Sequence, residues 1–128
     1  MTQPIEILRK RADFLAANKG LRNARPGFVL LTHPNDAASM RYGITVTKKI
    51  GNAVVRNRMK RRFRALLREL LPDQGVAGHD HVLIGRDSGI EREFACLRED
   101  LAAALARARQ GKGDRRRPRG PRSAARRS

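Results

Sequence analysis

Apolar residues recur with helical spacing over residues 53–71, and this is the strongest pattern in the chain. A helix of about 3.6 residues per turn places these positions on one face, and they are Val55, Met59, Phe63, Leu66 and Leu70. Asn52 can accept a hydrogen bond from a free N–H group at a helix start, and Pro72 has no N–H to donate. The sequence therefore predicts an amphipathic helix that begins after Asn52 and ends at Pro72.

Two further segments show helical patterns. Residues 5–18 carry apolar positions among arginines and lysine, with Pro4 at the start and Gly20 at the end, and they predict a short helix. Ser88 and Glu91 have the spacing of a capping box and would open a last helix, which Gly111 ends. One face of that helix is apolar, at Phe94, Leu97, Leu101, Leu105 and Ala108.

Three segments predict strands. Residues 28–33 are rich in strand formers, and in residues 41–48 Tyr42, Ile44 and Val46 alternate with small or polar residues. The polar stretch 34–39 between these two runs suggests an antiparallel hairpin, and residues 81–85 form an apolar run typical of a buried strand. Amphipathic helices combined with strands predict an α+β sandwich, with the helices on one face of the sheet.

The charge of the chain indicates that this domain binds a polyanion. The 128 residues include 29 Lys and Arg against 12 Asp and Glu, a net charge of +17. Such a balance excludes a neutral metabolic enzyme as the leading hypothesis and favours nucleic acid as the partner. Aromatic residues make up 4% of the chain and there is no Trp, which argues against an extended stacking surface for single-stranded bases.

The same composition bounds the rest of the interpretation. Cys96 is the single cysteine, so an internal disulfide or a cysteine-based zinc site is excluded. We expect a cytoplasmic protein, because no apolar run is long enough to span a membrane and no signal peptide is recognisable. Residues 111–128 are rich in Arg, Gly, Pro and Ser, so we expect a folded domain over residues 1–110 and a disordered basic tail over 111–128.

The predicted central helix carries a dense cationic surface. Seven Lys and Arg residues between positions 53 and 71 face a single acid, Glu69, which is unlike the alternating charges of a solvated, ion-paired helix. Like charges four residues apart, such as Lys60 and Arg64, each destabilise an isolated helix by a few tenths of a kcal/mol. A phosphate backbone would compensate for this repulsion. The segment Lys48-Lys-Ile-Gly-Asn52 precedes this helix and adds a turn whose backbone amides favour anions.

The run KKIGNAVVRNRMKRRFR, residues 48–64, closely resembles the signature of the bacterial ribonuclease P protein component. The similarity extends over residues 5–110. It implies an α-β-β-β-α-β-α domain similar to one domain of a small-subunit ribosomal protein, with a left-handed crossover and a short edge strand near residues 21–25. The apolar pattern alone does not predict that edge strand.

The resemblance also implies a function. In this family a large RNA cleaves precursor tRNA at the mature 5′ end with RNA-bound Mg²⁺, and the protein is a non-catalytic subunit. The implied partners are ribonuclease P RNA and precursor tRNA, with no obligate protein partner, no membrane and no cofactor bound by the chain itself. The protein would bind the catalytic RNA through its cationic helix and the single-stranded 5′ leader in a cleft between the first helix and the sheet.

Carried onto this sequence, the resemblance implies two groups of site residues. The RNA-binding group is Lys48, Lys49, Arg56, Asn57, Arg58, Lys60, Arg61, Arg62, Arg64 and Arg68. The leader-binding group is Arg11, Phe14 and Thr45. Asn18 and Leu31 stand where other members often place aromatics, which leaves Phe14 as the one ring of the first helix. Phe14 also fits a position in the core, and the sequence does not decide between the two roles.

Other classes fit the residues less well. A protein-only nuclease needs clustered carboxylates for a metal pair, whereas the acids here are scattered or crowd the last helix. His79 and His81 lack metal-ligand spacing with a third residue and are interpreted as polar loop residues, and Cys96 has no evident activating base. A ribosomal or other structural RNA-binding protein shares the charge and the fold class, and it is the alternative that the sequence leaves open.

Overall fold

The computed structural model describes residues 5–35 and 39–114. The elements, in chain order, are β1 (Ile5–Ile7), α1 (Arg11–Ala17), β2 (Leu21–Ala24), β3 (Phe28–Pro34), β4 (Met40–Thr45), α2 (Ala53–Gln74), β5 (His79–Gly85), the 3-10 turn η1 (Asp87–Gly89) and α3 (Phe94–Arg109). The predicted α+β class is confirmed. In the described part of the chain, no helix is both long and apolar enough to cross a membrane.

The strands form one mixed sheet in the order β1-β4-β5-β3-β2. The predicted hairpin of β3 and β4 is wrong, because β5 lies between them, antiparallel to β3 and parallel to β4. The reason is burial: Val82 and Leu83 of β5 are buried on opposite faces of the sheet. A strand that is covered on both faces belongs in the middle of the sheet. The parallel neighbours β4 and β5 are joined through α2, so the β4-α2-β5 connection is the crossover that the resemblance implies. Its left-handedness stays a prediction.

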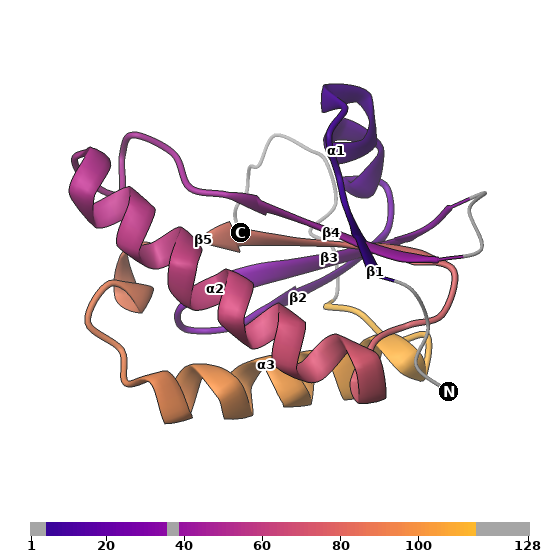
Figure 1. Ribbon diagram of the computed structural model, residues 1–128. Coiled ribbons are helices and arrows are strands. Elements are labelled where there is room, and N and C mark those ends of the chain that lie inside the picture. The colour runs from indigo at the N-terminus through magenta and orange to yellow at the C-terminus, as the bar shows by residue number, and fades with distance from the viewer. Residues whose placement is uncertain (1–4, 36–38, 115–128) are drawn as a thin grey trace, which may run out of the picture.

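Helices lie on both faces of the sheet (Figure 1), with α2 and α3 on one face and α1 on the other. The main core lies under α2 and α3, where the rings of Phe28 and Phe63 meet edge to face at 5.9 Å between centroids. A smaller cluster lies on the α1 face and includes Leu8, Ala17 and Leu31. The two long helices thus occupy one face, as expected, and the short first helix occupies the other.

The periodicity of α2 is confirmed by burial. Met59, Phe63, Leu66 and Leu70 are buried, together with Leu67 and Leu71, which widen the apolar face. The side chain of Asn52 accepts from the backbone N–H of Val55 at 3.0 Å, as predicted for the cap. Pro72 does not end the helix, which continues to Gln74. Proline lacks the N–H donor and its ring crowds the carbonyl four residues earlier, but the burial of Leu70 and Leu71 offsets this cost and holds the last turn in place.

The ends of the other helices differ from the predictions. Only residues 11–17 of the predicted helix 5–18 are helical, because Ile5–Ile7 pair in parallel with β4 as an edge strand. The short strand implied near residues 21–25 is present as β2 at the opposite edge. The capping box of Ser88 and Glu91 is wrong, since α3 begins at Phe94 and residues 87–89 form η1. Backbone carbonyls of that segment bind a side chain of α2 instead, as described below.

The fold continues past the predicted domain boundary at residue 110. Gly111, with φ +75°, reverses the chain after α3, and the following residues lie along the edge of β2. The backbone N–H of Asp114 donates to the carbonyl of Arg22 at 2.6 Å, and its carboxylate accepts from the N–H of Ala24 at 2.6 Å. The buried side chain of Asn23 donates to the carbonyl of Lys112. Residues 111–114 therefore belong to the domain, and the remainder of the expected tail lies outside the described residues.

Strand β5 begins at His79, two residues before the predicted strand 81–85, so His79 and His81 belong to a strand and the interpretation of this pair as polar loop residues is wrong. The His81 ring is fully buried, accepts from the backbone N–H of Val76 through Nε2 at 3.0 Å and lies 3.1 Å from the carbonyl of Arg41 through Nδ1. Because Nε2 accepts, the proton of the neutral ring resides on Nδ1 and is donated to that carbonyl. Burial lowers the pKa of His81 to about 4.

This depressed pKa predicts a loss of stability in acid. Burial favours the neutral ring in the fold, so its stabilisation is complete above the unfolded pKa of about 6.5 and declines as the pH falls toward 4. The shift corresponds to a loss of about 3 kcal/mol in unfolding free energy over this range. Thermal unfolding of the wild type and His81→Gln between pH 7 and 4 checks this. The variant should be less stable at pH 7 and less sensitive to acid, and parallel curves would contradict the prediction.

The contacts of residues 111–114 predict where the chain can be shortened. The free energy of unfolding should be about 1–3 kcal/mol lower for a chain that ends at Gln110 than for one that ends at Asp114. The shorter chain lacks the groups that bind the buried amide of Asn23 and the outer edge of β2. Urea unfolding of the two truncated chains measures the difference. Equal midpoints would show that these contacts contribute nothing to the domain.

Candidate nucleic-acid interface

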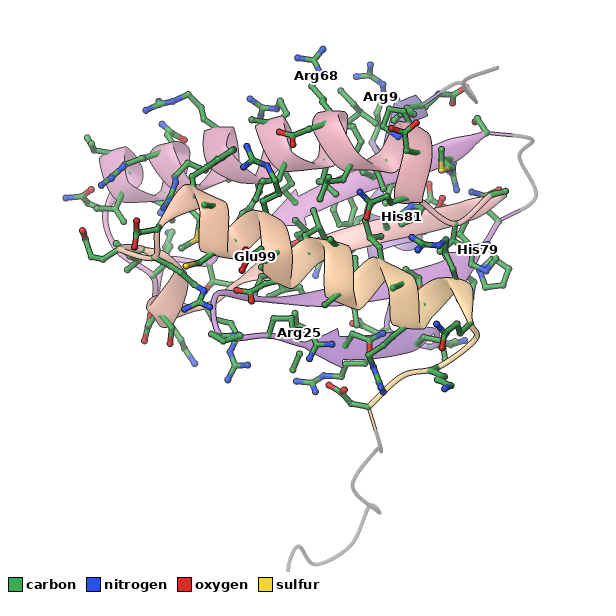
Figure 2. The ribbon with its side chains drawn as sticks, turned by 90° about the horizontal axis from the view of Figure 1, so that it is seen from below. Arg9, Arg25, Arg68, His79, His81 and Glu99 are labelled. Carbon is green, nitrogen blue, oxygen red and sulfur yellow. The ribbon has the colours of Figure 1, made fainter. Side chains whose placement is uncertain are left out.

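The outward side of α2 presents four exposed arginines, Arg58, Arg61, Arg64 and Arg68, which we call the α2 cation face. They project from the side of the helix opposite its buried leucines, and Figure 2 shows Arg68 extending outward into solvent. Asn57 is also exposed on this side and Lys60 is partly buried at its margin. The sequence prediction that one helix separates an apolar stripe from a cationic surface is thus realised in the fold.

The α2 cation face has little neutralisation from within the protein. Glu69, the acid nearest these arginines along α2, binds Arg98 of α3 with 2.7 Å between Nε and Oε2. Across residues 5–35 and 39–114, none of the ion pairs includes a member of the face. The four positive charges therefore remain available to an external anion.

Two arginines of the predicted RNA-binding group are used inside the protein. The guanidinium of Arg62 donates to the carbonyls of Gly89 and Ile90 at 3.3 and 3.4 Å and to the carbonyl of Arg92. Burial, followed by the charge of Arg58, lowers the pKa of Arg62. Arg62 thus fixes the segment between η1 and α3, where the sequence had suggested a capping box. Arg56 donates through Nε to the carbonyl of Gly51 at 3.2 Å and holds the turn before α2.

The remaining predicted residues divide between two places. Lys48 and Lys49 are exposed in the turn that leads into α2, so they adjoin the α2 cation face. Phe14 and Thr45 lie instead on the α1 face of the sheet. The ring of Phe14 packs against Gly43, two positions before Thr45 on the same side of β4. Arg11 is exposed at the first position of α1.

The position of Phe14 is compatible with both roles that the sequence left open. Its ring packs against the small cluster on the α1 face, yet the residue is only partly buried. Leu31, which stands where relatives often have an aromatic, is buried in that cluster, and Asn18 is exposed just after α1. An aromatic ring with one side on the sheet and part of its surface in solvent can stack with a base without leaving its place.

Sequence reasoning missed Arg41 and Gly43, which connect α1 to the sheet. Arg41 binds Asp80 of β5 and Asp13 of α1, and Gly43 lies under the ring of Phe14. The available signals were the charge of Arg41 at the start of the predicted strand 41–48 and the glycine Gly43 within that strand. No group of three or more His, Cys, Asp or Glu side chains that could hold a metal ion occurs among the residues described.

The sequence of this chain is similar to those of known proteins. The family model for ribonuclease P matches residues 3–109. The ribonuclease P protein component of Erythrobacter litoralis is 73% identical over 119 residues, which cover 93% of this chain and 98% of that protein. The chain belongs to the ribonuclease P protein family. It is therefore a protein component of a tRNA-processing ribonucleoprotein and a partner of ribonuclease P RNA.

Solved ribonuclease P proteins also share the fold. The protein from Staphylococcus aureus superimposes with a TM-score of 0.70 at 30% identity, covering 83% of this chain and 97% of that one. The protein from Thermotoga maritima gives a TM-score of 0.70 at 32% identity with the same coverage. The family assignment and the arrangement of the sheet and helices therefore rest on both sequence and structure.

The different surroundings of Arg61 and Arg62 predict different effects on stability. Arg62→Ala should reduce the free energy of unfolding by about 1–3 kcal/mol, because three backbone carbonyls lose their donor. The neighbouring substitution Arg61→Ala removes an exposed side chain and should change it by less than about 0.5 kcal/mol. Thermal or urea unfolding of the two variants without RNA measures the contrast. Equal stabilities would refute the structural role of Arg62.

Proposed function

We propose that this ribonuclease P protein binds the catalytic RNA through the α2 cation face and the single-stranded 5′ leader of precursor tRNA through the α1 face of the sheet. The observation that carries the proposal is the set of arginines on the outward side of α2 that no acid of the described chain neutralises. On this view the chain promotes 5′ maturation while the RNA performs the cleavage. The protein then acts where its substrate is found, in the cytoplasm.

Electrostatics support the first contact. Each phosphate neutralised by Lys or Arg releases condensed counterions and contributes about 0.7–0.9 to the slope of log affinity against log salt. The α2 cation face offers four such cations from successive turns of one helix, and Lys48 and Lys49 in the turn before the helix bring the number to six. Because α2 is anchored by its buried face, these side chains are presented from a fixed backbone, which reduces the entropy lost on binding.

The α1 face supports the second contact. Phe14 offers a partly exposed ring, Thr45 a hydroxyl on the same face, and Arg11 a charge at the start of α1. This combination suits a single strand, whose bases stack on aromatic rings while its phosphates meet cations. The sheet separates this surface from α2, so one protein can contact two RNA segments at once.

The pairing of acidic side chains with arginines supports a non-catalytic role for the chain. Asp80 binds Arg41, Asp100 binds Arg92 and Glu69 binds Arg98, each with an N···O distance of 2.7 Å. Carboxylates paired in this way serve as partners of arginine, whereas a two-metal nuclease needs them converging on one site. We therefore assign Mg²⁺ to the RNA subunit and no cofactor to the chain.

Cleavage of precursor tRNA at low Mg²⁺ tests the proposal. The RNA subunit with this protein should cleave faster than the RNA alone, and the highly purified protein without RNA should not cleave. Arg61→Ala should require several-fold more protein for the same stimulation, and its RNA-binding salt slope should fall by about 0.7–0.9. Arg22→Ala, which removes an exposed charge from the far edge strand, is the matched control and should behave as the wild type.

The opposite outcomes are equally specific. Cleavage by the protein alone would assign catalysis to the chain. An Arg61→Ala variant that binds the RNA with unchanged affinity and salt slope would remove α2 from the interface. Binding to many structured RNAs with no stimulation of cleavage would favour a purely structural RNA-binding role.

A further inference from the structure

Arg41 joins three elements on the α1 face. Its guanidinium forms a bidentate pair with Asp80 of β5, with N···O distances of 2.7 and 2.8 Å, and reaches Asp13 of α1 at 3.6 Å. Asp80 is almost fully buried and also accepts from Asn35 at 2.8 Å. The hydrogen bonds to Asp80 raise the pKa of Arg41, which stays charged. Arg41 is therefore fixed on the sheet and offers one remaining contact to α1.

Gly43 provides the surface on which the ring of Phe14 lies. A Cβ atom at Gly43 would approach Cε1 and Cζ of Phe14 to 2.4 and 2.5 Å, and Leu8 to 3.2 Å. Separations below 3.0 Å are not tolerated, so any side chain at this position would displace the ring. Gly43 and Arg41 lie two residues apart on β4 and therefore face the same side of the sheet.

The short helix α1 depends on its contacts with the sheet for its position. It has seven residues, its N-cap Lys10 makes no side-chain capping bond, and Ala17 is its only fully buried residue. An isolated helix of this length is unstable in water, so tertiary contacts set its position. The contact of Asp13 with Arg41 and the contact of Phe14 with Gly43 come from adjacent residues of α1. Together with the buried Ala17, these two contacts set the distance of the helix from the sheet and its rotation.

We propose that Arg41 and Gly43 are positioning residues for leader recognition, which hold the ring of Phe14 at the height where an unpaired RNA base can stack on it. The inference rests on the function proposed above for the α1 face. Gly43 permits Cε1 and Cζ of the ring to approach the strand closely, and Arg41 prevents α1 from turning the ring away. Neither residue needs to touch the RNA, so their effect depends on Phe14 being present.

A double-mutant cycle at positions 14 and 43 tests this dependence. The holoenzyme, assembled from ribonuclease P RNA and saturating protein, is titrated with a cleavage-resistant precursor tRNA and with mature tRNA. The ratio of the two affinities is the leader selectivity. Phe14→Ala should reduce it about tenfold, within the range for the loss of one stacked base. Gly43→Ala should reduce it by a similar factor, and the double variant should lose no more than Phe14→Ala alone.

Controls separate positioning from general loss of stability. Gly111→Ala changes another glycine, which has φ +75° and lies beyond α3 on the other face, so it should lower the melting temperature without changing selectivity. Asp13→Asn weakens the tie to Arg41 without inserting an atom beneath the ring, and it should reduce selectivity by about two- to fivefold. This variant keeps the proposal testable if Gly43→Ala alone does not fold.

Each remaining outcome has a defined meaning. Loss of selectivity in Phe14→Ala but in neither Gly43→Ala nor Asp13→Asn overturns the positioning role and leaves the proposed function intact. Additive losses in the double variant show that Gly43 acts on the RNA independently of the ring, which also overturns it. Unchanged selectivity in Phe14→Ala overturns the leader role of the α1 face and the positioning role with it.

Discussion

The burial of one side of α2 against the sheet is the interaction on which the rest of the structure depends. Phe63, Leu66 and Leu67 are fully buried there, and each such side chain contributes about 1.5–3 kcal/mol. Repulsion between arginines on the outward side costs a few tenths of a kcal/mol for each pair one turn apart. The core therefore outweighs the repulsion severalfold. A helix with this cationic surface is stable in the folded protein although its own charges oppose it.

The same packing determines which arginines are free. Residues on the flank of α2 nearest α3 meet that helix and the segment before it, so Arg62 binds carbonyls and Glu69 binds Arg98. Arg62 and Arg98 also lie over the ring of Phe94, at 6.0 and 5.1 Å from its centroid. Only side chains turned away from both the sheet and α3 remain for a ligand. The position of α3 thus divides one run of basic residues into structural and surface members.

The sequence correctly predicted the features that depend on residues close together along the chain. The apolar period of α2, its Asn52 cap and the buried face of α3 follow from local spacing, and the structure confirms them. The predicted hairpin failed because strand pairing is non-local: β5, which follows α2, enters between β3 and β4. The predicted end of α2 at Pro72 failed for a related reason, since tertiary burial of the adjacent leucines outweighs the local cost of a proline in the last turn.

The candidate site shows the same limit. The cations of α2 could be found by counting charges on a helical wheel, but the distinction between Arg61 and Arg62 depends on a loop nearly 30 residues away. Arg41 and Asp80 are 39 residues apart in the chain and meet only because β4 and β5 are neighbours. A glycine in a strand suggests close approach of another group, yet it does not name Phe14. The two proposed RNA-binding surfaces therefore differ in origin: the α2 surface arises from helical periodicity, whereas the α1 surface exists only after the sheet has assembled.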